Sequence, residues 1–186
     1  MPSLPDEPAV AYRTQRLVIR DWVEAEADRM YDMYRRAEVV RFLGSVPTPM
    51  PSRDRAVQRI GAHRERNAGW RDAGTPYGWW AVEVAETETV VGTIALLPID
   101  DVAGPEAPVE VAWHLHPDAQ GRGYATEAAR GAFDRGHAAG IVEVLALTDP
   151  ANVPSQAVCD RLGLELVETS DRFYGKPLMI WRSRRA

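Results

Sequence analysis

One glycine-bearing turn constrains the fold of this chain more than any other segment. Residues 109–116 alternate apolar and polar side chains, which predicts a β-strand. The turn Gln120-Gly121-Arg122-Gly123-Tyr124-Ala125 follows, and a helix rich in small residues is expected from near Thr126. Because the first amides of a helix have no partner within it, a strand, a glycine turn and a helix start can together hold an anion. The segment is therefore a candidate anion site at a junction between a strand and a helix.

Two familiar phosphate-binding motifs fit this turn poorly. A Walker loop would end in Gly-Lys-Ser/Thr, which is missing here. A dinucleotide fingerprint needs a third small residue and an acid about 20 positions later, so Gly121, Gly123 and Thr126 match badly even though Glu143 is near the required distance. On spacing alone, a phosphate site and a plain tight turn both stay open.

A resemblance covers most of the chain. The pattern Gln-x-x-Gly-x-Ala at 120–125 is similar to the coenzyme A pyrophosphate loop of the GNAT superfamily of N-acetyltransferases. The surrounding sequence resembles the branch that includes the ribosomal-protein N-terminal (alanine) acetyltransferases. Besides that loop, the matching segments in chain order are 14–20, 91–94, 113–117, 123–128 and 152–164.

The resemblance implies a mixed, mostly antiparallel α/β sheet of about seven strands, with splayed fourth and fifth strands and flanking helices. Residues 1–11 are expected to be a mobile lead-in, and residues 12–183 a single domain. Periodicity and capping predict helices at 24–37, 39–43, 52–66, 126–140 and 152–163, and strands at 17–20, 77–84, 89–97, 109–116, 142–147, 164–167 and 177–181.

The same resemblance implies that the cofactor is acetyl-CoA. Its pyrophosphate is expected on Gln120, Gly121, Arg122, Gly123, Tyr124, Ala125 and Thr126. Its pantetheine arm is expected along the main chain of the fourth strand, at Trp113, Leu115 and His116, and near Asn152 and Ser155. Arg122 can equally extend into solvent, and Asn152 can equally serve as a helix cap.

Three residues are candidates for proton transfer. Glu110 and His114 lie on one face of the fourth strand, and either is a candidate general base. Glu110 can equally be a structural carboxylate, and His114 a packed histidine. The resemblance implies that Ser155 is the acid for the departing thiolate; it can equally be a first-turn residue that bonds the backbone. Many relatives carry a tyrosine where Cys159 stands, and a buried thiol replaces it poorly.

The acceptor is expected to be a primary amine, on a peptide or a small molecule. In the family one wall of the acceptor groove corresponds to Phe42 and Leu43, and the other to residues 173–176. The resemblance also makes a homodimer plausible. A non-catalytic acyl-CoA-binding module is the alternative, since Cys159 replaces the usual tyrosine.

Composition excludes several other classes. The net charge of −5 argues against nucleic-acid binding, and no apolar stretch is long enough to cross a membrane. The single cysteine, Cys159, excludes an intramolecular disulfide and a cysteine-rich metal site; no metal is expected. The N-terminus lacks the apolar run of a secretory leader, so we expect a cytoplasmic protein.

Overall fold

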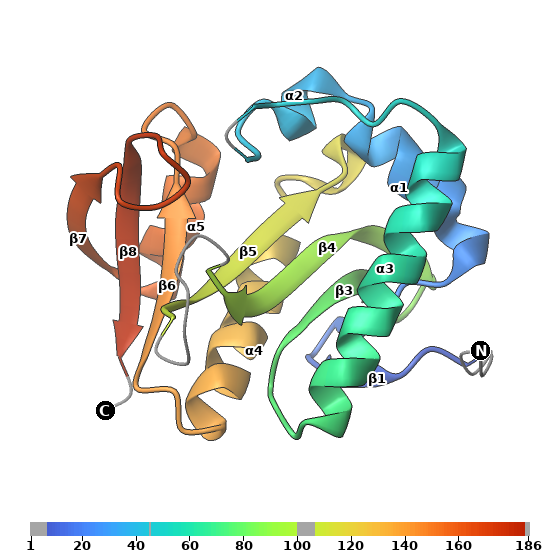
Figure 1. Cartoon of the computed structure of the whole chain (residues 1–186), viewed down its shortest axis with the longest axis horizontal. Helices are drawn as coiled ribbons and strands as arrows, with labels where there is room; N and C mark the ends of the chain where they lie inside the picture. The colour runs from blue at the N-terminus through green and yellow to red at the C-terminus, as the bar shows by residue number, and fades with distance from the viewer. Residues whose placement is uncertain (1–6, 45, 100–106, 185–186) are drawn as a thin grey trace.

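The computed structural model describes residues 7–44, 46–99 and 107–184. Eight strands form one sheet in the order β1-β2-β3-β4-β5-β6-β8-β7 (Figure 1). Every neighbouring pair is antiparallel except β5 and β6, which are parallel. The strands are β1 (Val10–Arg13), β2 (Leu17–Arg20), β3 (Gly78–Val84), β4 (Thr89–Pro98), β5 (Val109–Leu115), β6 (Glu143–Thr148), β7 (Glu165–Ser170) and β8 (Leu178–Arg184).

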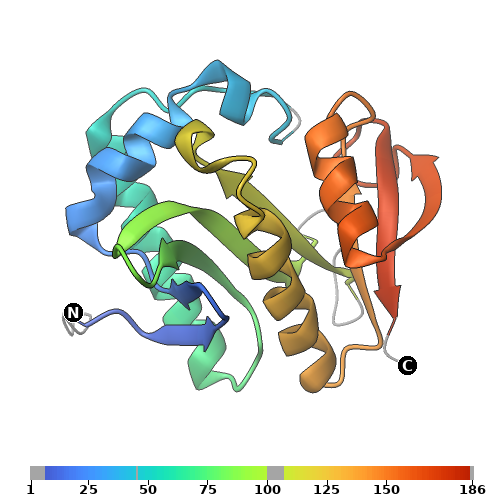
Figure 2. The same cartoon turned by 180° about the vertical axis from the view of Figure 1, so that it is seen from behind.

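The described ranges contain five α-helices, and four of them cover the two faces of this sheet. The five are α1 (Ala27–Tyr34), α2 (Ala37–Val40), α3 (Arg53–Asp72), α4 (Tyr124–Ala138) and α5 (Val153–Leu162), with short 3₁₀ turns at Glu24–Glu26 and Pro117–Ala119. Helices α1 and α3 pack on one face, while α4 and α5 lie on the other, as the reverse view makes plain (Figure 2).

The helices pack closely on both faces. Ala129, Ala132, Phe133 and Gly136 of α4 are buried against the sheet, as the small-residue pattern predicted. A Cβ atom at Gly136 would come within 3.2 Å of Val144 Cγ2, so the helix approaches the sheet as closely as a glycine allows. On the other face, Met30, Met33 and Ile60 belong to a second buried cluster.

Strands β5 and β6 diverge along most of their length. They pair only at Val109↔Val144 and Glu110↔Leu145, and then separate toward their C-terminal ends (Figure 1). The predicted splay is therefore present, between the strands that correspond to the fourth and fifth of the family. Beyond Glu110, β5 is hydrogen-bonded to β4 on one side and faces an opening on the other.

The sheet has eight strands rather than about seven. The additional strand is β1, which places Val10 and Ala11 in the sheet although residues 1–11 were expected to be a mobile lead-in. Tyr12 fixes this strand, because its hydroxyl donates to the carbonyl oxygen of Ala128 at 2.7 Å. Residues 1–6 of the expected lead-in lie outside the described part of the chain.

Several element boundaries differ from those expected. Helix α3 continues to Asp72 rather than ending near Arg66, and its predicted cap is confirmed, since Ser52 accepts a hydrogen bond from the Arg55 amide. The helix expected at 24–37 is divided into a 3₁₀ turn and α1. The strand expected from 142 begins at Glu143, and the Val142 side chain is 67% exposed. None of the helices in the described ranges has the length and apolar character that a bilayer crossing needs.

Candidate active site

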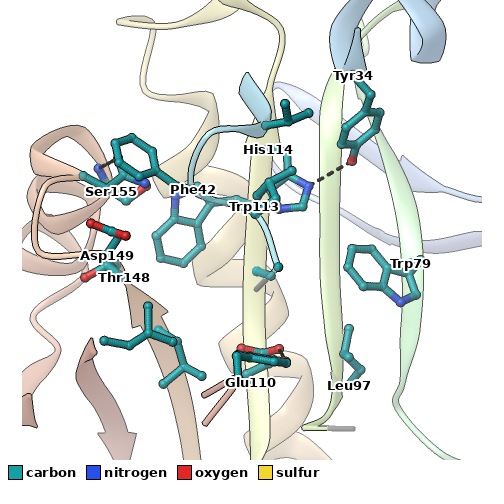
Figure 3. Close-up of a pocket in the computed structure, with 18 of the residues that line it drawn as sticks. Tyr34, Phe42, Trp79, Leu97, Glu110, Trp113, His114, Thr148, Asp149 and Ser155 are labelled. Carbon is teal, nitrogen blue, oxygen red and sulfur yellow. Dashed lines mark hydrogen bonds between the residues drawn. The ribbon is translucent and has the colours of Figure 1, made fainter. Parts of the chain in front are cut away.

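A cavity of about 550 Å³ occupies the opening between β5 and β6 and extends to α1 and α3. This volume is in the range of small-molecule sites. Figure 3 shows Glu110, Trp113 and His114 of β5 in the centre of the cavity. Ser155, Asp149 and Thr148 lie on the β6–α5 side, and Tyr34 and Trp79 lie on the opposite side (Figure 3).

The open edge of β5 offers main-chain groups to a ligand. The amide of His116 donates to the carbonyl oxygen of Val91 at 2.9 Å, so this residue faces β4. The main-chain N–H and C=O groups of successive residues in an antiparallel strand point alternately to its two sides. Those of His114 therefore also point toward β4, whereas those of Trp113 and Leu115 point into the opening. The Gln120 side chain confirms this direction for Leu115, since its Nε2 donates to the Leu115 carbonyl oxygen at 3.3 Å.

His116 does not have the position expected of a cofactor contact. Its amide is used within the sheet, and its ring Nε2 lies 2.8 Å from Asp32 Oδ2. Its Nδ1 accepts from the Asp118 amide at the 3₁₀ turn. The side chain is buried, so His116 is a structural residue that holds the turn after β5. The resemblance implied a main-chain contact to the cofactor at His116, and the use of its amide within the sheet leaves Trp113 and Leu115 as the candidates for that contact.

The turn after β5 forms an anion cradle. Gly121 and Gly123 have φ angles of 75° and 79°, in the left-handed region that favours glycine. Helix α4 begins at Tyr124, two residues before the expected Thr126, and its first hydrogen bond runs from the Glu127 amide to the Gly123 carbonyl oxygen. The amides of Tyr124, Ala125 and Thr126 therefore have no partner within the helix.

A cluster around Arg16 fixes the position of this turn. Its guanidinium donates to the Arg122 carbonyl oxygen at 3.1 Å and to Glu127 Oε2 at 2.7 Å, and it lies over the Tyr124 ring. Thr14 Oγ1 also donates to Glu127 Oε1, at 2.6 Å. These contacts tie the turn to the β1–β2 connection, so the cradle is held in place before any ligand arrives.

The cradle and the opened strand edge fit coenzyme A. The turn can accept the pyrophosphate on the amides of α4, and Trp113 and Leu115 can bond an extended arm as an additional strand would. Thr126 Oγ1 is buried without a hydrogen-bond partner among the described residues, at the helix end where phosphate oxygens would be expected. Gln120 and Arg122 are exposed at this turn.

Glu110 is a buried carboxylate that lies where β5 and β6 begin to separate. The Tyr174 hydroxyl, from the connection between β7 and β8, donates a hydrogen bond to Glu110 Oε1. Tyr174 thereby joins the C-terminal strands to β5 across the cavity. Tyr174 and Lys176 line the cavity on this side, and Phe42 and Leu43 line it from the segment after α2, so both acceptor walls expected from the resemblance meet at one site.

His114 lies among aromatic side chains. Its Nδ1 is 2.9 Å from the Tyr34 hydroxyl, which also hydrogen-bonds Thr93 Oγ1 at 3.1 Å (Figure 3). Burial, together with the nearby Arg59 guanidinium, lowers the pKa of His114 to about 4. The imidazole is therefore neutral at pH 7, and it is no stronger a base than an ordinary carboxylate.

Ser155 and Asn152 lie together at the start of α5. The Asn152 side chain accepts from the Ser155 amide at 3.3 Å, which confirms that Asn152 caps this helix. Both residues line the cavity. Cys159, one turn further on, is fully buried, and burial raises the pKa of its thiol to about 12. It is therefore a core residue with no thiolate at neutral pH.

Sequence reasoning missed several cavity residues. Asp149 follows β6, and Tyr34 ends α1. Arg59, His63 and Arg66 project from one face of α3, at the spacing i, i+4 and i+7. That spacing was visible in the sequence, but nothing in it showed which face of α3 meets the cavity.

A splayed sheet with a glycine turn at its open strand edge, and with titratable groups in the adjoining cavity, is the arrangement expected of a CoA-dependent acyltransferase. Residues 16–165 match the family model described as the acetyltransferase (GNAT) domain. The chain therefore belongs to the GNAT acetyltransferase family. The expected fold, enzyme class and cofactor, acetyl-CoA, are thereby confirmed.

Solved structures agree with this assignment. An acetyltransferase from Agrobacterium tumefaciens shares 25% identity, with 98% of this chain and 96% of that chain covered and a TM-score of 0.66. The ribosomal-protein-S5-alanine acetyltransferase from Vibrio fischeri shares 14% identity, with 93% and 95% covered and a TM-score of 0.69. A ribosomal L7/L12 α-N-protein acetyltransferase in complex with coenzyme A shares 13% identity, with 95% and 98% covered and a TM-score of 0.71. At such identities the last two structures show a common fold.

Proposed function

We propose that this protein transfers the acetyl group of acetyl-CoA to a primary amine that binds beside Glu110. The observation that carries the proposal is that a buried carboxylate on β5 and the Ser155 hydroxyl on the β6–α5 side line one cavity, which the open edge of β5 also lines. Two of the solved relatives are named for acetylating ribosomal proteins, so a peptide α-amine is the first acceptor class to test.

The cofactor supplies an acetyl thioester, and the chain supplies binding and proton transfer. The α4 amides and the turn at Gly121 and Gly123 hold the pyrophosphate, while Trp113 and Leu115 align the arm. An amide of the open β5 edge donates to the thioester oxygen and so stabilises negative charge on it. The contacts at Arg122, Ala125 and Asn152 belong to the same proposal.

Glu110 is the proposed general base. It takes the proton of the attacking amine, directly or through one water, and the Tyr174 hydroxyl holds its carboxylate in position. His114 was the other candidate, but its lowered pKa removes the advantage an imidazole normally has at neutral pH. Its Nδ1 is also bonded to Tyr34. Ser155 is the proposed donor to the departing thiolate.

Thiol release from acetyl-CoA tests this function, against N-terminal peptides, aminoglycosides, polyamines and free amino acids. We expect amine-dependent release well above hydrolysis, and a fall of about 100-fold or more in kcat for Glu110→Gln with coenzyme A affinity retained. His114→Gln should have a smaller effect. Binding of coenzyme A without transfer to any amine would instead favour the non-catalytic acyl-CoA-binding module. A homodimer and a cytoplasmic location remain predictions.

A further inference from the structure

The wall of the cavity formed by α3 is cationic. Arg59, His63 and Arg66 lie on the helix face that lines the cavity. Burial and the two neighbouring arginines lower the pKa of His63 to about 3, so the positive charge of this wall comes from the guanidinium groups. Neither α3 nor α1 contributes a carboxylate to the cavity lining.

Arg59 has surroundings unlike those of the structural arginines. Its guanidinium lies 5.0 Å from the centroid of the Tyr34 ring, and the side chain is half-buried. Among the described residues, no carboxylate lies within ion-pair distance of it, although acidic residues outnumber basic ones in the chain by 27 to 22. Arg20 and Arg71, by contrast, pair with Glu26 and Asp21.

The carboxylates of the cavity lining lie away from the wall formed by α3. Glu110 projects from β5, and Asp149 follows β6 (Figure 3). The Arg59 guanidinium therefore lies near Tyr34 and His114, away from both carboxylates, while Lys176 is a further cation of the lining, on the side of Glu110 and Tyr174. A ligand that carries both charges would match both sides: its ammonium group is drawn to the carboxylates and its anionic group to Arg59.

We infer that the acceptor is an amine that also carries an anionic oxygen group, a carboxylate or a phosphate, and that Arg59 binds this group. The inference rests on the proposed acetyl transfer and adds the substrate class. A guanidinium presents paired donors that match both carboxylate and phosphate, and a half-buried position strengthens such contacts. Tyr34 holds the guanidinium over its ring, so the receptor is positioned before the acceptor binds.

Matched acceptor pairs test the inference by thiol release. One pair is the peptides Ala-Glu-Glu-Ala-Ala and Ala-Gln-Gln-Ala-Ala, and the other is O-phosphoethanolamine and ethanolamine. We expect kcat/KM to be about tenfold or more higher for the anionic member of at least one pair, as one charge-assisted contact can provide. The pair that shows the preference identifies the anion as a carboxylate or a phosphate.

Variants on α3 assign the preference to one side chain. In Arg59→Gln the preference should largely disappear, and in Arg59→Lys, which retains the charge but not the paired donors, it should be intermediate. Arg55→Gln is the control, because Arg55 is exposed on the same helix and outside the cavity lining. This control should keep the preference of the wild type.

Binding to the CoA-loaded protein, measured by calorimetry with the same pairs, separates the two proposals. Arg59-dependent binding of an anionic member without any acetyl transfer would support the anion site and refute the proposed transfer. Equal binding and equal turnover of both members in the wild type, or a preference that survives in Arg59→Gln, would overturn the inference even if acetyl transfer is efficient.

Discussion

Replacing Gly123 by alanine should weaken coenzyme A binding through backbone strain rather than through a clash. Gly123 has φ 79° and ψ 2°, and a Cβ atom there would meet only Arg16 Nη2, at an ordinary 3.4 Å. An L-residue in this left-handed conformation costs about 1–2 kcal/mol. In the variant this strain opposes the Arg16 contacts that hold the turn, so the exposed turn leaves the left-handed form in the unliganded protein and must return to it to hold the pyrophosphate.

That strain corresponds to a loss of about 5- to 30-fold in affinity, since about 1.4 kcal/mol is tenfold. The assay is calorimetric titration with coenzyme A, combined with thermal unfolding of the unliganded protein. Gly140→Ala is a matched control: Gly140 has φ 92°, lies at the far end of the same helix, and a Cβ atom there would meet no neighbour within 4 Å.

We therefore expect Gly140→Ala to lower the unfolding temperature and leave coenzyme A affinity unchanged, whereas Gly123→Ala lowers the affinity. Wild-type affinity in Gly123→Ala would refute the assignment of this turn as the pyrophosphate cradle. An equal loss of affinity in both variants would show that the effect comes from general destabilisation.

Three further predictions concern the cavity and the core beside it. Ser155→Ala should lower kcat far more than coenzyme A affinity, and equal losses in titration and turnover would return Ser155 to a structural role. The pKa of His114 is about 4 in the folded protein and about 6.5 in the unfolded chain, so between about pH 4 and 6.5 the folded state binds fewer protons. The free energy of unfolding should therefore fall as the pH drops from about 6.5 toward 4. Thermal unfolding across this range should show a shallower decline for His114→Gln, and an identical decline would contradict the lowered pKa. Cys159→Ala should keep wild-type kcat, because a buried thiol with a pKa of about 12 donates no proton readily; a large loss in thiol release would assign it a catalytic role.

The sequence predicted the local geometry of the turn and of the α5 cap better than the acceptor wall. Local chemistry determines a glycine turn and a capped helix, so the left-handed Gly121 and Gly123 and the Asn152 cap followed from short motifs, whereas the assignment of the turn to coenzyme A came from the family resemblance. Strand alternation also placed Glu110 and His114 on the cavity. The buried position of the His116 ring could not be predicted, because its contact with Asp32 joins segments 84 residues apart and nothing local indicates that pairing.

The acceptor wall needed the folded structure. Arg59 becomes a cavity residue only because α3 crosses β3, where buried Asn67 accepts from the Trp79 amide and donates to its carbonyl oxygen. Tyr174, which hydrogen-bonds Glu110, lies 64 positions later in the chain. Such contacts depend on how the strands are ordered in the sheet. Strand β1 was missed for another reason: an edge strand of four residues is too short to give a clear alternating pattern in the sequence.

Strands β5 and β6 pair at two positions only, so a cofactor bound between them contributes to the stability of the sheet. A ligand that hydrogen-bonds the open edge of β5 uses main-chain groups that no neighbouring strand uses. Because it binds the folded protein and not the unfolded chain, it favours the native state by mass action. At a coenzyme A concentration of about 100 times its Kd, this linkage adds about 2.7 kcal/mol to the free energy of unfolding. The conformational stability of β6 and the strands beyond it is therefore set partly by the supply of coenzyme A, and amide exchange there should slow as the cofactor is added.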